Sequence, residues 1–323
     1  MNVDALTYAG NVESIPGSEG NPRYVLERVD IVNATEVERC FRTHRPSTVL
    51  HLAAESHVDR SIDGPGAFVQ TNVVGTFNML HGALGYWRSL PAAEAERFRF
   101  VHVSTDEVFG SLGPEGAFSE TSPFRPNSPY SASKAGADHL ARAWYHTYGF
   151  PVVTTNCSNN YGPYQFPEKL IPLVILNALE ERRLPVYGTG GNVRDWLYVE
   201  DHVEALLAVA ARGRPGETYA VGGRTERRNI DVVHAICDMV DEMRPLSSGS
   251  RRALIEFVTD RPGHDQRYAI DSTKIERELG IVPRESFESG LRKTVAWYLE
   301  NTSWVDRVRS GAYRGERLGL GLQ

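Results

Sequence analysis

The chain has 323 residues, of which 41% are hydrophobic, and this is enough for one large domain or two ordinary ones. Its 35 Lys and Arg against 41 Asp and Glu give a formal charge of −6, so bulk charge does not favour binding to nucleic acid or to a membrane surface. No apolar run approaches the length of a membrane span, and Cys40, Cys157 and Cys237 are scattered as reduced thiols would be. We therefore expect a globular, cytoplasmic protein.

Strands and helices are predicted to alternate over the first half of the chain. Apolar and β-branched runs predict strands at 1–4, 24–28, 47–52, 98–103 and 151–156, and helices are expected at 35–44, 66–87 and 130–148. Such alternation is typical of a parallel sheet with helices on both faces. The predicted fold class is α/β, with a Rossmann-like doubly wound parallel sheet.

The alternation loosens after residue 157. Helices are expected at 169–182, 201–211 and 230–242, with two more closing the chain, and strands at 184–187, 194–198, 217–221 and 254–258. A polar loop is expected at 157–163, and the long Gly-, Pro- and Ser-rich loop at 111–129 would cover or line a site. We expect a dinucleotide-binding domain over 1–157 and a smaller, mainly substrate-binding region over 158–323.

Tyr130 and Lys134 lie four residues apart at the start of a predicted helix and therefore share one of its faces. An ammonium close to a phenol favours the phenolate, so we expect Lys134 to lower the pKa of Tyr130 toward working pH. A tyrosine of this kind can take a proton from a substrate hydroxyl. A surface Tyr with a solvated Lys is the plain alternative for a pair of this spacing.

The sequence Ser104-Thr105-Asp106-Glu107 directly follows the predicted strand 98–103. In open α/β sheets, sites form at the carboxyl ends of strands. Two adjacent carboxyl groups beside an apolar strand, with no basic residue close in sequence, should have raised pKa values that suit general acid and base work. The alternative interpretation is that they only cap a loop.

Several other charged residues have both a binding and a plain structural interpretation. Asp4 at a strand end suits a cofactor ribose as well as a plain loop position, and Asp30 and Ile31 suit an adenine, although an Asp at a strand end is more often a turn or helix-cap residue. Arg194 and the segment Asp260–His264 suit a diphosphate, with surface ion pairs as the default. The histidines show no metal-binding spacing, so no metal is expected.

Six motifs in order along the chain resemble the dTDP-glucose 4,6-dehydratase family of extended short-chain dehydrogenases/reductases. They are Leu52–Ser61, Ser104–Gly110, Tyr130–Lys134, Cys157–Pro163, Arg194–Asp201 and Arg261–Asp265. The Thr-Asp-Glu triplet at Thr105–Glu107 separates these dehydratases from the related sugar 4-epimerases. The resemblance implies NAD as cofactor, dTDP-glucose as substrate and a homodimer formed by the helices near 66–87 and 128–148.

The resemblance also implies roles for individual residues. Catalysis would use Thr105, Asp106 as acid, Glu107 as base, Tyr130 and Lys134. Contacts to NAD would come from Asp4, Asp30, Ile31, Leu52, Ala53, Ala54, Ser56, Thr71, Tyr130, Lys134 and Asn160. Contacts to the sugar nucleotide would come from Ser56, Thr105, Asn159, Lys169, Leu170, Pro185, Val186, Tyr187, Arg194, Asn229, Asp260, Arg261 and His264.

One part of the family pattern is absent from this sequence. The family opens with a strand, a glycine-rich turn and a helix ahead of the position of Asp4, and Gly17–Gly20 does not replace that turn. We expect either that the start of this sequence lies inside a longer reading frame or that the protein binds its cofactor poorly. The alternatives in function are another nucleotide-sugar 4,6-dehydratase or 4-epimerase, or a non-catalytic partner subunit without a working NAD site.

Overall fold

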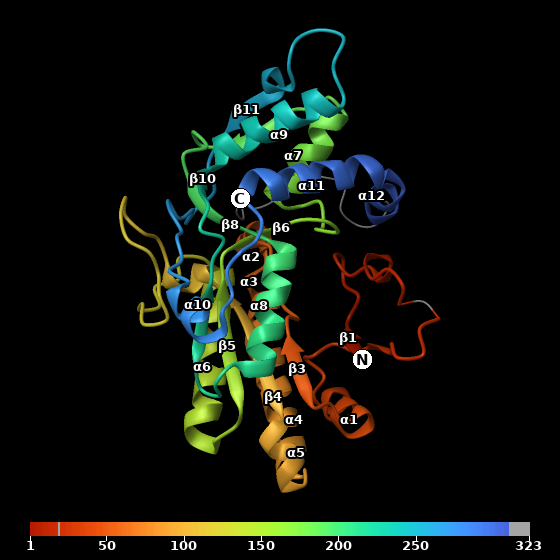
Figure 1. Ribbon diagram of the computed structural model, residues 1–323, viewed down its shortest axis with the longest axis vertical. Helices are drawn as coiled ribbons and strands as arrows, with labels where there is room; N and C mark the ends of the chain where they lie inside the picture. Colours follow the sequence, from red (N-terminus) through yellow and green to blue (C-terminus); the bar gives the residue numbers. More distant parts are fainter. Residues whose placement is uncertain (19, 310–323) are drawn as a thin grey trace.

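The computed structural model describes residues 1–18 and 20–309 (Figure 1). The strands are β1 (Asn2–Asp4), β2 (Leu26–Arg28), β3 (Thr48–His51), β4 (Arg99–Thr105), β5 (Val152–Cys157), β6 (Asn159–Tyr161), β7 (Leu184–Tyr187), β8 (Val193–Tyr198), β9 (Thr218–Val221), β10 (Glu226–Arg228) and β11 (Ile255–Val258). The α-helices are α1 (Ala34–His44), α2 (Val58–Asp63), α3 (Pro65–Phe68), α4 (Thr76–Arg88), α5 (Ala92–Arg97), α6 (Pro129–Tyr148), α7 (Leu170–Leu179), α8 (Val199–Arg212), α9 (Asn229–Met243), α10 (Thr273–Leu279), α11 (Phe287–Glu300) and α12 (Thr302–Arg309). Short 3-10 helices cover Val12–Ser14, Asp106–Phe109 and Arg251–Leu254, and a π-helix covers Val69–Gly75.

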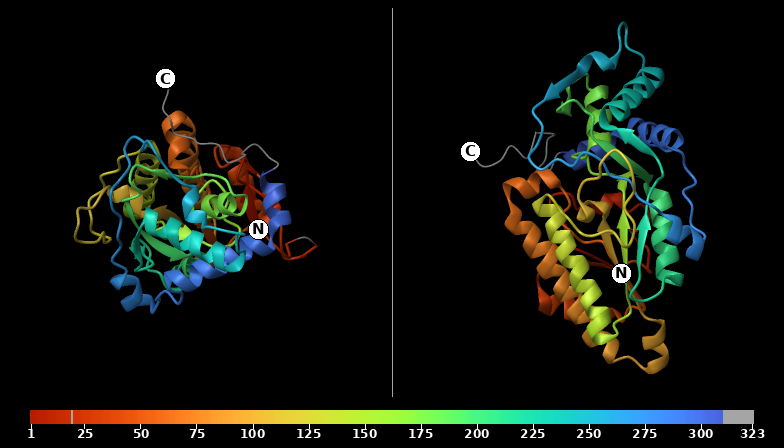
Figure 2. Two further views of the ribbon diagram at one scale, coloured as in Figure 1. Left: turned by 90° about the horizontal axis from the view of Figure 1, so that it is seen from above. Right: turned by 90° about the vertical axis from the view of Figure 1, so that its left-hand side faces the viewer.

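The central sheet is parallel and has the strand order β3-β4-β5-β9. The residues of β4 after Arg99 and the first five residues of β5 are buried, because helices cover both faces of the sheet. Helices α4 and α6 lie on one face and α8 on the other, as the right-hand view of Figure 2 shows. This confirms the predicted α/β class. In the register of β4 and β5, Thr105 stands opposite Cys157, so the polar residues after both strands meet at one edge.

Strands β1 and β2 pair in parallel with each other in a separate two-stranded sheet. Strand β9, which lies well beyond residue 157, pairs with β5 in the central sheet. Part of the predicted region 158–323 therefore belongs to the central sheet. The division of the chain at residue 157 stays a prediction.

A second hydrophobic core lies at the upper end of the molecule in Figure 1, among α7, α9, α11 and α12. Its largest fully buried side chains include Tyr161, Ile171, Ile175 and Tyr298. The mixed sheet β10-β8-β6 and the pair β11-β7 join this core. Among the described residues, none of the helices has both the length and the apolar character needed to cross a bilayer.

Helix α6 begins and ends with strong local signals. The Ser128 hydroxyl accepts the Ser131 N–H and the Ser131 hydroxyl accepts the Ser128 N–H, which is a reciprocal capping box. Pro129 occupies the first turn, and Gly149, with a φ of 65°, ends the helix. These caps fix where the helix starts and therefore which way Tyr130 and Lys134 face.

Three local predictions differ from the structure. The helix expected at 66–87 is interrupted by the π-helix, where Gly75 lies so close to Ile31 that a Cβ would stand 2.6 Å from its Cδ1. The loop expected at 157–163 contains β6, because Asn159–Tyr161 pairs with β8. The glycine-rich segment Gly188–Gly191, whose sequence suggests a hairpin-like turn before Arg194, does not form a hairpin, because β7 and β8 belong to different sheets.

Five histidines are held neutral by burial, which lowers the pKa of each imidazole below its usual value. They are His51, His57, His102, His202 and His264. The rings of His51 and His102 also contact each other, with centroids 5.7 Å apart, so protonation of one opposes protonation of the other. Acid should therefore destabilise the fold.

We predict that the free energy of unfolding falls as the pH falls below about 6.5. The unfolded chain binds protons on these imidazoles there and the folded chain does not, so each well-buried histidine costs up to about 2 kcal/mol at pH 5. Urea unfolding at about pH 7.5 and about pH 5 measures the loss. His202→Gln, which removes one titrating ring, should lose less between the two pH values, and an equal loss would contradict the prediction.

Candidate active site

A cavity of about 470 Å³ lies at the carboxyl ends of the central strands. Most of the residues predicted to bind or react line it: Leu52, Ala54, Ser56, Thr105, Asp106, Glu107, Tyr130, Lys134, Asn159, Asn160, Lys169, Leu170, Pro185, Val186, Tyr187, Arg194, Asn229, Arg261 and His264. They come from both halves of the sequence. The fold therefore brings the predicted catalytic and nucleotide-binding residues into one site.

The other predicted residues do not line this cavity. Asp4 accepts the N–H of Leu6 at 2.7 Å and Asp30 accepts the N–H of Val32 at 2.9 Å, so both act as turn residues here. Ile31 is buried in a core with Val37 and Leu80.

Ala53, Thr71 and Asp260 also lie outside the cavity lining. Asp260 contacts the ring of His264 at 2.6 Å, so it orients a residue that does line it. The cavity thus holds only part of the predicted cofactor contacts, and the residues predicted for the adenine and its ribose lie elsewhere.

Tyr130 and Lys134 are both buried on α6, but the expected effect of Lys134 on Tyr130 was wrong for the protein without ligands. Burial raises the pKa of Tyr130 well above its usual value, and the nearby Glu107 and Cys157 raise it further. The Lys134 ammonium donates to the carbonyl of Val103 at 2.8 Å. A hydrogen bond with Thr105 opposes the rise in the Tyr130 pKa.

Asp106 and Glu107 both have raised pKa values, which confirms the expectation for adjacent carboxyl groups at this strand end. Burial is the main cause for Asp106, and Glu107 and Asp195 add to it, so the protonated form of Asp106 is favoured. One Asp106 oxygen receives the Thr105 hydroxyl at 3.3 Å and the other, Oδ2, is buried without a partner. The site therefore holds an acid with an unpaired polar atom.

Glu107 differs from Asp106 in its surroundings. Burial raises its pKa, but the cations Arg261, Arg194 and Lys169 oppose this rise. These cations follow Glu107 by many residues in the sequence, which is why the sequence showed no basic partner. Both carboxyl groups therefore have raised pKa values, but Glu107 has more cations close by that favour its negative form than Asp106 does.

Behind this site, Asp138 holds two residues of the sheet. One carboxylate oxygen of Asp138 lies 2.8 Å from Nε2 of His102, and the other accepts the Asn156 amide at 3.0 Å. The same Asn156 amide donates to the carbonyl of Thr105 at 3.0 Å. Asp138 follows Lys134 by four residues on α6, so this network fixes the strand end against the helix.

The loop after β3 is fixed by a residue that the sequence did not single out. Asn72, in the π-helix, accepts the N–H of Glu55 and donates to its carbonyl, each at 2.9 Å, and donates to the Ser133 hydroxyl at 2.8 Å. The loop predicted to contact NAD is thereby tied to α6. Asn78 holds the turn after Asp30 in the same way, through the carbonyls of Ile31 and Val32.

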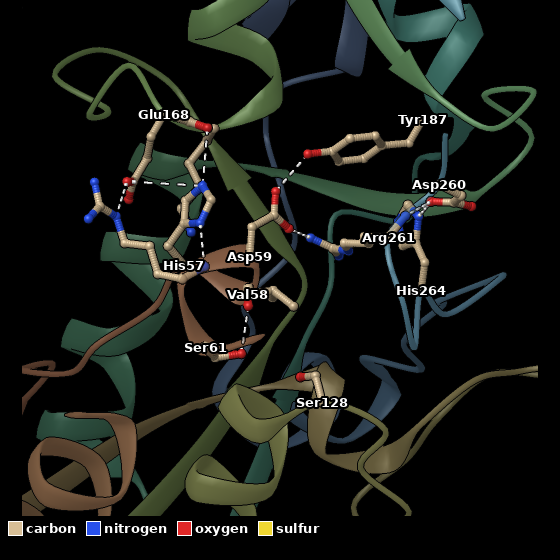
Figure 3. Close-up of polar contacts among 12 residues, drawn as sticks. His57, Val58, Asp59, Ser61, Ser128, Glu168, Tyr187, Asp260, Arg261 and His264 are labelled. Atoms are coloured by element: carbon tan, nitrogen blue, oxygen red, sulfur yellow. Dashed lines mark hydrogen bonds and ion pairs between the residues drawn. The ribbon is translucent and has the colours of Figure 1, made fainter. Parts of the chain in front are cut away.

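The cations predicted to bind the sugar nucleotide converge on the cavity. The buried Arg194 donates to the carbonyls of Val193 and Asp265 and lies 4.3 Å from the ring centroid of Tyr268. Lys169 donates to the carbonyl of Ser56 at 2.6 Å. Arg261 donates to Asp59 at 2.6 Å, and Figure 3 shows that contact beside Tyr187 and His264. Asp59 is a further residue that the sequence did not reveal.

Several residues that line the cavity have polar side-chain atoms that a bound cofactor would satisfy. The side-chain oxygens Ser104 Oγ and Asn159 Oδ1 belong to cavity-lining residues and are buried without hydrogen-bond partners. A ligand rich in amide and hydroxyl groups would satisfy them. No group of three or more His, Cys, Asp or Glu in residues 1–18 and 20–309 is arranged to hold a metal ion.

Comparison with known proteins places these features in a family. A family model described as GDP-mannose 4,6 dehydratase matches residues 1–294. The dTDP-glucose 4,6-dehydratase of Neisseria meningitidis serogroup B is 58% identical over 325 residues, which cover 99% of this chain and 92% of that protein. The dTDP-glucose 4,6-dehydratase 1 of Escherichia coli K12 is also 58% identical, over 97% of this chain and 89% of that protein.

Solved structures show the same fold. The dTDP-glucose 4,6-dehydratase DesIV of Streptomyces venezuelae, with NAD and TYD bound, has a TM-score of 0.86 and 45% identity, covering 95% of this chain and 89% of that chain. The UDP-glucose 4-epimerase of Thermus thermophilus, in complex with NAD, has a TM-score of 0.80 and 27% identity, covering 93% of this chain and 90% of that chain.

The parallel sheet and the Tyr130–Lys134 pair at its carboxyl edge define a Rossmann-type short-chain dehydrogenase/reductase. Within that class, the chain belongs to the GDP-mannose 4,6-dehydratase family, whose model it matches over most of its length.

We predict that Asp106→Asn stabilises the fold near neutral pH. Because burial raises the folded-state pKa of Asp106, the unfolded chain holds fewer protons above about pH 4, and stability is lost as the pH rises. An amide needs no proton, so thermal melting at about pH 7.5 should show a gain of roughly 3 °C or more. The gain should vanish near pH 4, where both side chains are neutral, and a gain of equal size there would refute this cause.

Proposed function

We propose that the protein uses NAD to convert dTDP-glucose into dTDP-4-keto-6-deoxyglucose and water. The observation that carries this proposal is the Asp106–Glu107 pair, with its opposed surroundings, in one cavity with Tyr130. Close relatives named dTDP-glucose 4,6-dehydratase support the choice of substrate. A solved relative with NAD bound supports the cofactor.

The cofactor would be held at its nicotinamide end by the loop Leu52–Ser56, by Lys134 and by Asn160. When bound, NAD supplies the acceptor of hydrogen from C4 of the sugar and the donor to C6, and its ring carries a positive charge that opposes the negative neighbours of Tyr130. The predicted contacts of Asp4, Asp30, Ile31 and Thr71 with the remainder of NAD are part of this proposal.

Tyr130, Thr105 and Lys134 would promote the oxidation at C4. The Tyr130 phenolate takes the proton of the C4 hydroxyl, and the Thr105 hydroxyl holds the same oxygen. Lys134, fixed to the carbonyl of Val103, supplies a positive charge on the same helical face as Tyr130. The new carbonyl makes the proton on C5 acidic.

Elimination would then use the two carboxyl groups in opposite roles. Glu107, whose negative form is favoured by three cations, takes the C5 proton. Asp106, kept protonated by burial, gives its proton to the C6 hydroxyl, which leaves as water. Return of hydrogen to C6 and reprotonation of C5 by Glu107 complete the product, with the loss of one water molecule.

The sugar nucleotide would lie across the second part of the chain. Arg194, Arg261 and Lys169 would face its diphosphate, since their charges converge on the cavity. Asn159, Leu170, Pro185–Tyr187, Asn229 and His264 would contact its other groups. The division into a cofactor-binding part over 1–157 and a substrate-binding part over 158–323, and a cytoplasmic location, belong to the same proposal.

Variants of Tyr130 and Glu107 should fail at different steps. Glu107→Gln should still reduce bound NAD, seen by its absorbance on adding dTDP-glucose, but form little product. Tyr130→Phe should lose both signals, with turnover lower by roughly 10²–10⁴, because it removes the base of the first step. Equal failure of both variants at NAD reduction would contradict the division of roles.

A homodimer is also proposed, through the surface of α4, α6 and the preceding π-helix. Val69, Phe77 and Tyr148 are exposed there by 49%, 40% and 41%, which is high for large apolar side chains on neighbouring helices. We predict that Phe77→Lys yields monomers, measured by light scattering at micromolar concentration. Val282→Lys, an equally exposed site far from these helices in sequence, is the control, and a dimer that survives Phe77→Lys would count against this interface.

A further inference from the structure

Asp59 is a buried carboxylate at the start of α2 that bridges two residues from the other part of the chain. Its Oδ2 accepts the hydroxyl of Tyr187 at 2.7 Å, and its Oδ1 accepts the Arg261 guanidinium at 2.6 Å. Figure 3 shows both groups pointing toward this one side chain. Asp59 itself is only 5% exposed, so Tyr187 and Arg261, rather than solvent, are the main partners of its carboxylate.

The contact between Asp59 and Arg261 is an ion pair at neutral pH. Burial opposes the charge of Asp59, but Arg261 and the Tyr187 hydroxyl lower the pKa of the carboxyl below its usual value. Burial likewise opposes the charge of Arg261, and Asp59 raises the pKa of the guanidinium. Each partner therefore keeps the other charged within a poorly solvated site.

A negative side chain beside a diphosphate site could act in either of two ways. It could repel the diphosphate, or it could hold the arginine in the orientation that binds it. The geometry favours the second, because Asp59 bonds to one terminal nitrogen of Arg261 while its Nε is buried without a hydrogen-bond partner. Arg261 thus keeps a donor that only a further acceptor would satisfy.

The rest of the segment Ser56–Arg60 makes parallel contacts with the second part of the chain. The carbonyl of Ser56 accepts Lys169, the ring of His57 reaches the carbonyl of Glu168 at 3.4 Å, and Arg60 pairs with the Glu168 carboxylate at 3.2 Å. Figure 3 shows the contact between His57 and Glu168 next to the Asp59 bridge. One short segment therefore orients both Lys169 and Arg261, two of the three cations in the cavity.

We propose that Asp59 is a positioning residue of the nucleotide site, which orients Arg261 and Tyr187 for a nucleoside diphosphate. The inference rests on the proposed function, since it takes Arg261 as a ligand of the diphosphate. It adds a specific role for a carboxylate that no binding or catalytic role so far includes.

The test is the affinity of the purified protein for dTDP, measured by titration calorimetry. Asp59→Asn keeps the size of the side chain and removes its charge, so Arg261 loses a charge-assisted bond and dTDP should bind about tenfold more weakly. Asp63→Asn, at the exposed end of the same helix, is the matched control and should bind as the parent does. Equal or tighter binding by Asp59→Asn would overturn the proposal and indicate repulsion.

A double-mutant cycle separates positioning from general damage to the fold. In an Arg261→Ala background, Asp59→Asn should have little further effect, because the group that it orients is gone. An unchanged tenfold loss in that background would refute the role. Tyr187→Phe, which removes the other bond to Asp59 and keeps the ring, should weaken dTDP binding by about threefold and remain folded even if Asp59→Asn does not.

Steady-state kinetics give a second readout. Asp59→Asn should raise KM for dTDP-glucose about tenfold with a much smaller change in kcat, because it alters binding and not the reacting groups. A tenfold fall in kcat with an unchanged KM would contradict a positioning role. If the parent protein itself fails to bind dTDP, the proposed function is refuted. If the parent and the variant bind dTDP equally well, only the role of Asp59 is refuted.

Discussion

The carboxyl groups of Asp106 and Glu107 are removed from water at the end of β4, and much of the surrounding structure offsets the cost of that burial. For Asp106 the cost is avoided by protonation, which burial itself favours. For Glu107 it is reduced by Arg194, Arg261 and Lys169, all from the second part of the chain. The acid and base character of the pair therefore depends on how the two parts meet across the cavity.

The elements that the sequence predicted best are those with local causes. The apolar run of β4, the capping signals of α6 and the position of the carboxyl pair directly after a strand all depend on residues close together in sequence. The parallel direction of the central strands also followed from alternation alone. The π-helix was not predicted, and within it Gly75 lies against Ile31, a residue far away in the sequence.

The sequence identified site residues only where a recognisable motif also lies at the cavity in the structure. The predicted direction of the Tyr130 pKa shift was wrong because its spacing from Lys134 says nothing of the burial of the phenol, which is the main cause, or of the nearby Glu107 and Cys157. Asp59, Asn72 and Asp138 were missed for the same reason, since each acts through partners at least 17 residues away. A dehydratase and an epimerase both share the fold of this chain, with TM-scores of 0.86 and 0.80. The fold alone therefore does not determine the reaction, which depends on the side chains in the cavity.

Tyr130, Lys134 and Asp138 form a single row along α6, each separated from the next by one helical turn. Insertion or deletion of one residue between them would rotate the later members by about 100° and separate the phenol, the ammonium and the carboxylate. Natural variation in length should therefore be excluded from this stretch. Variation in length should accumulate instead in the preceding 111–128 loop. The places where insertions are tolerated would therefore show which spacings between residues the chemistry requires.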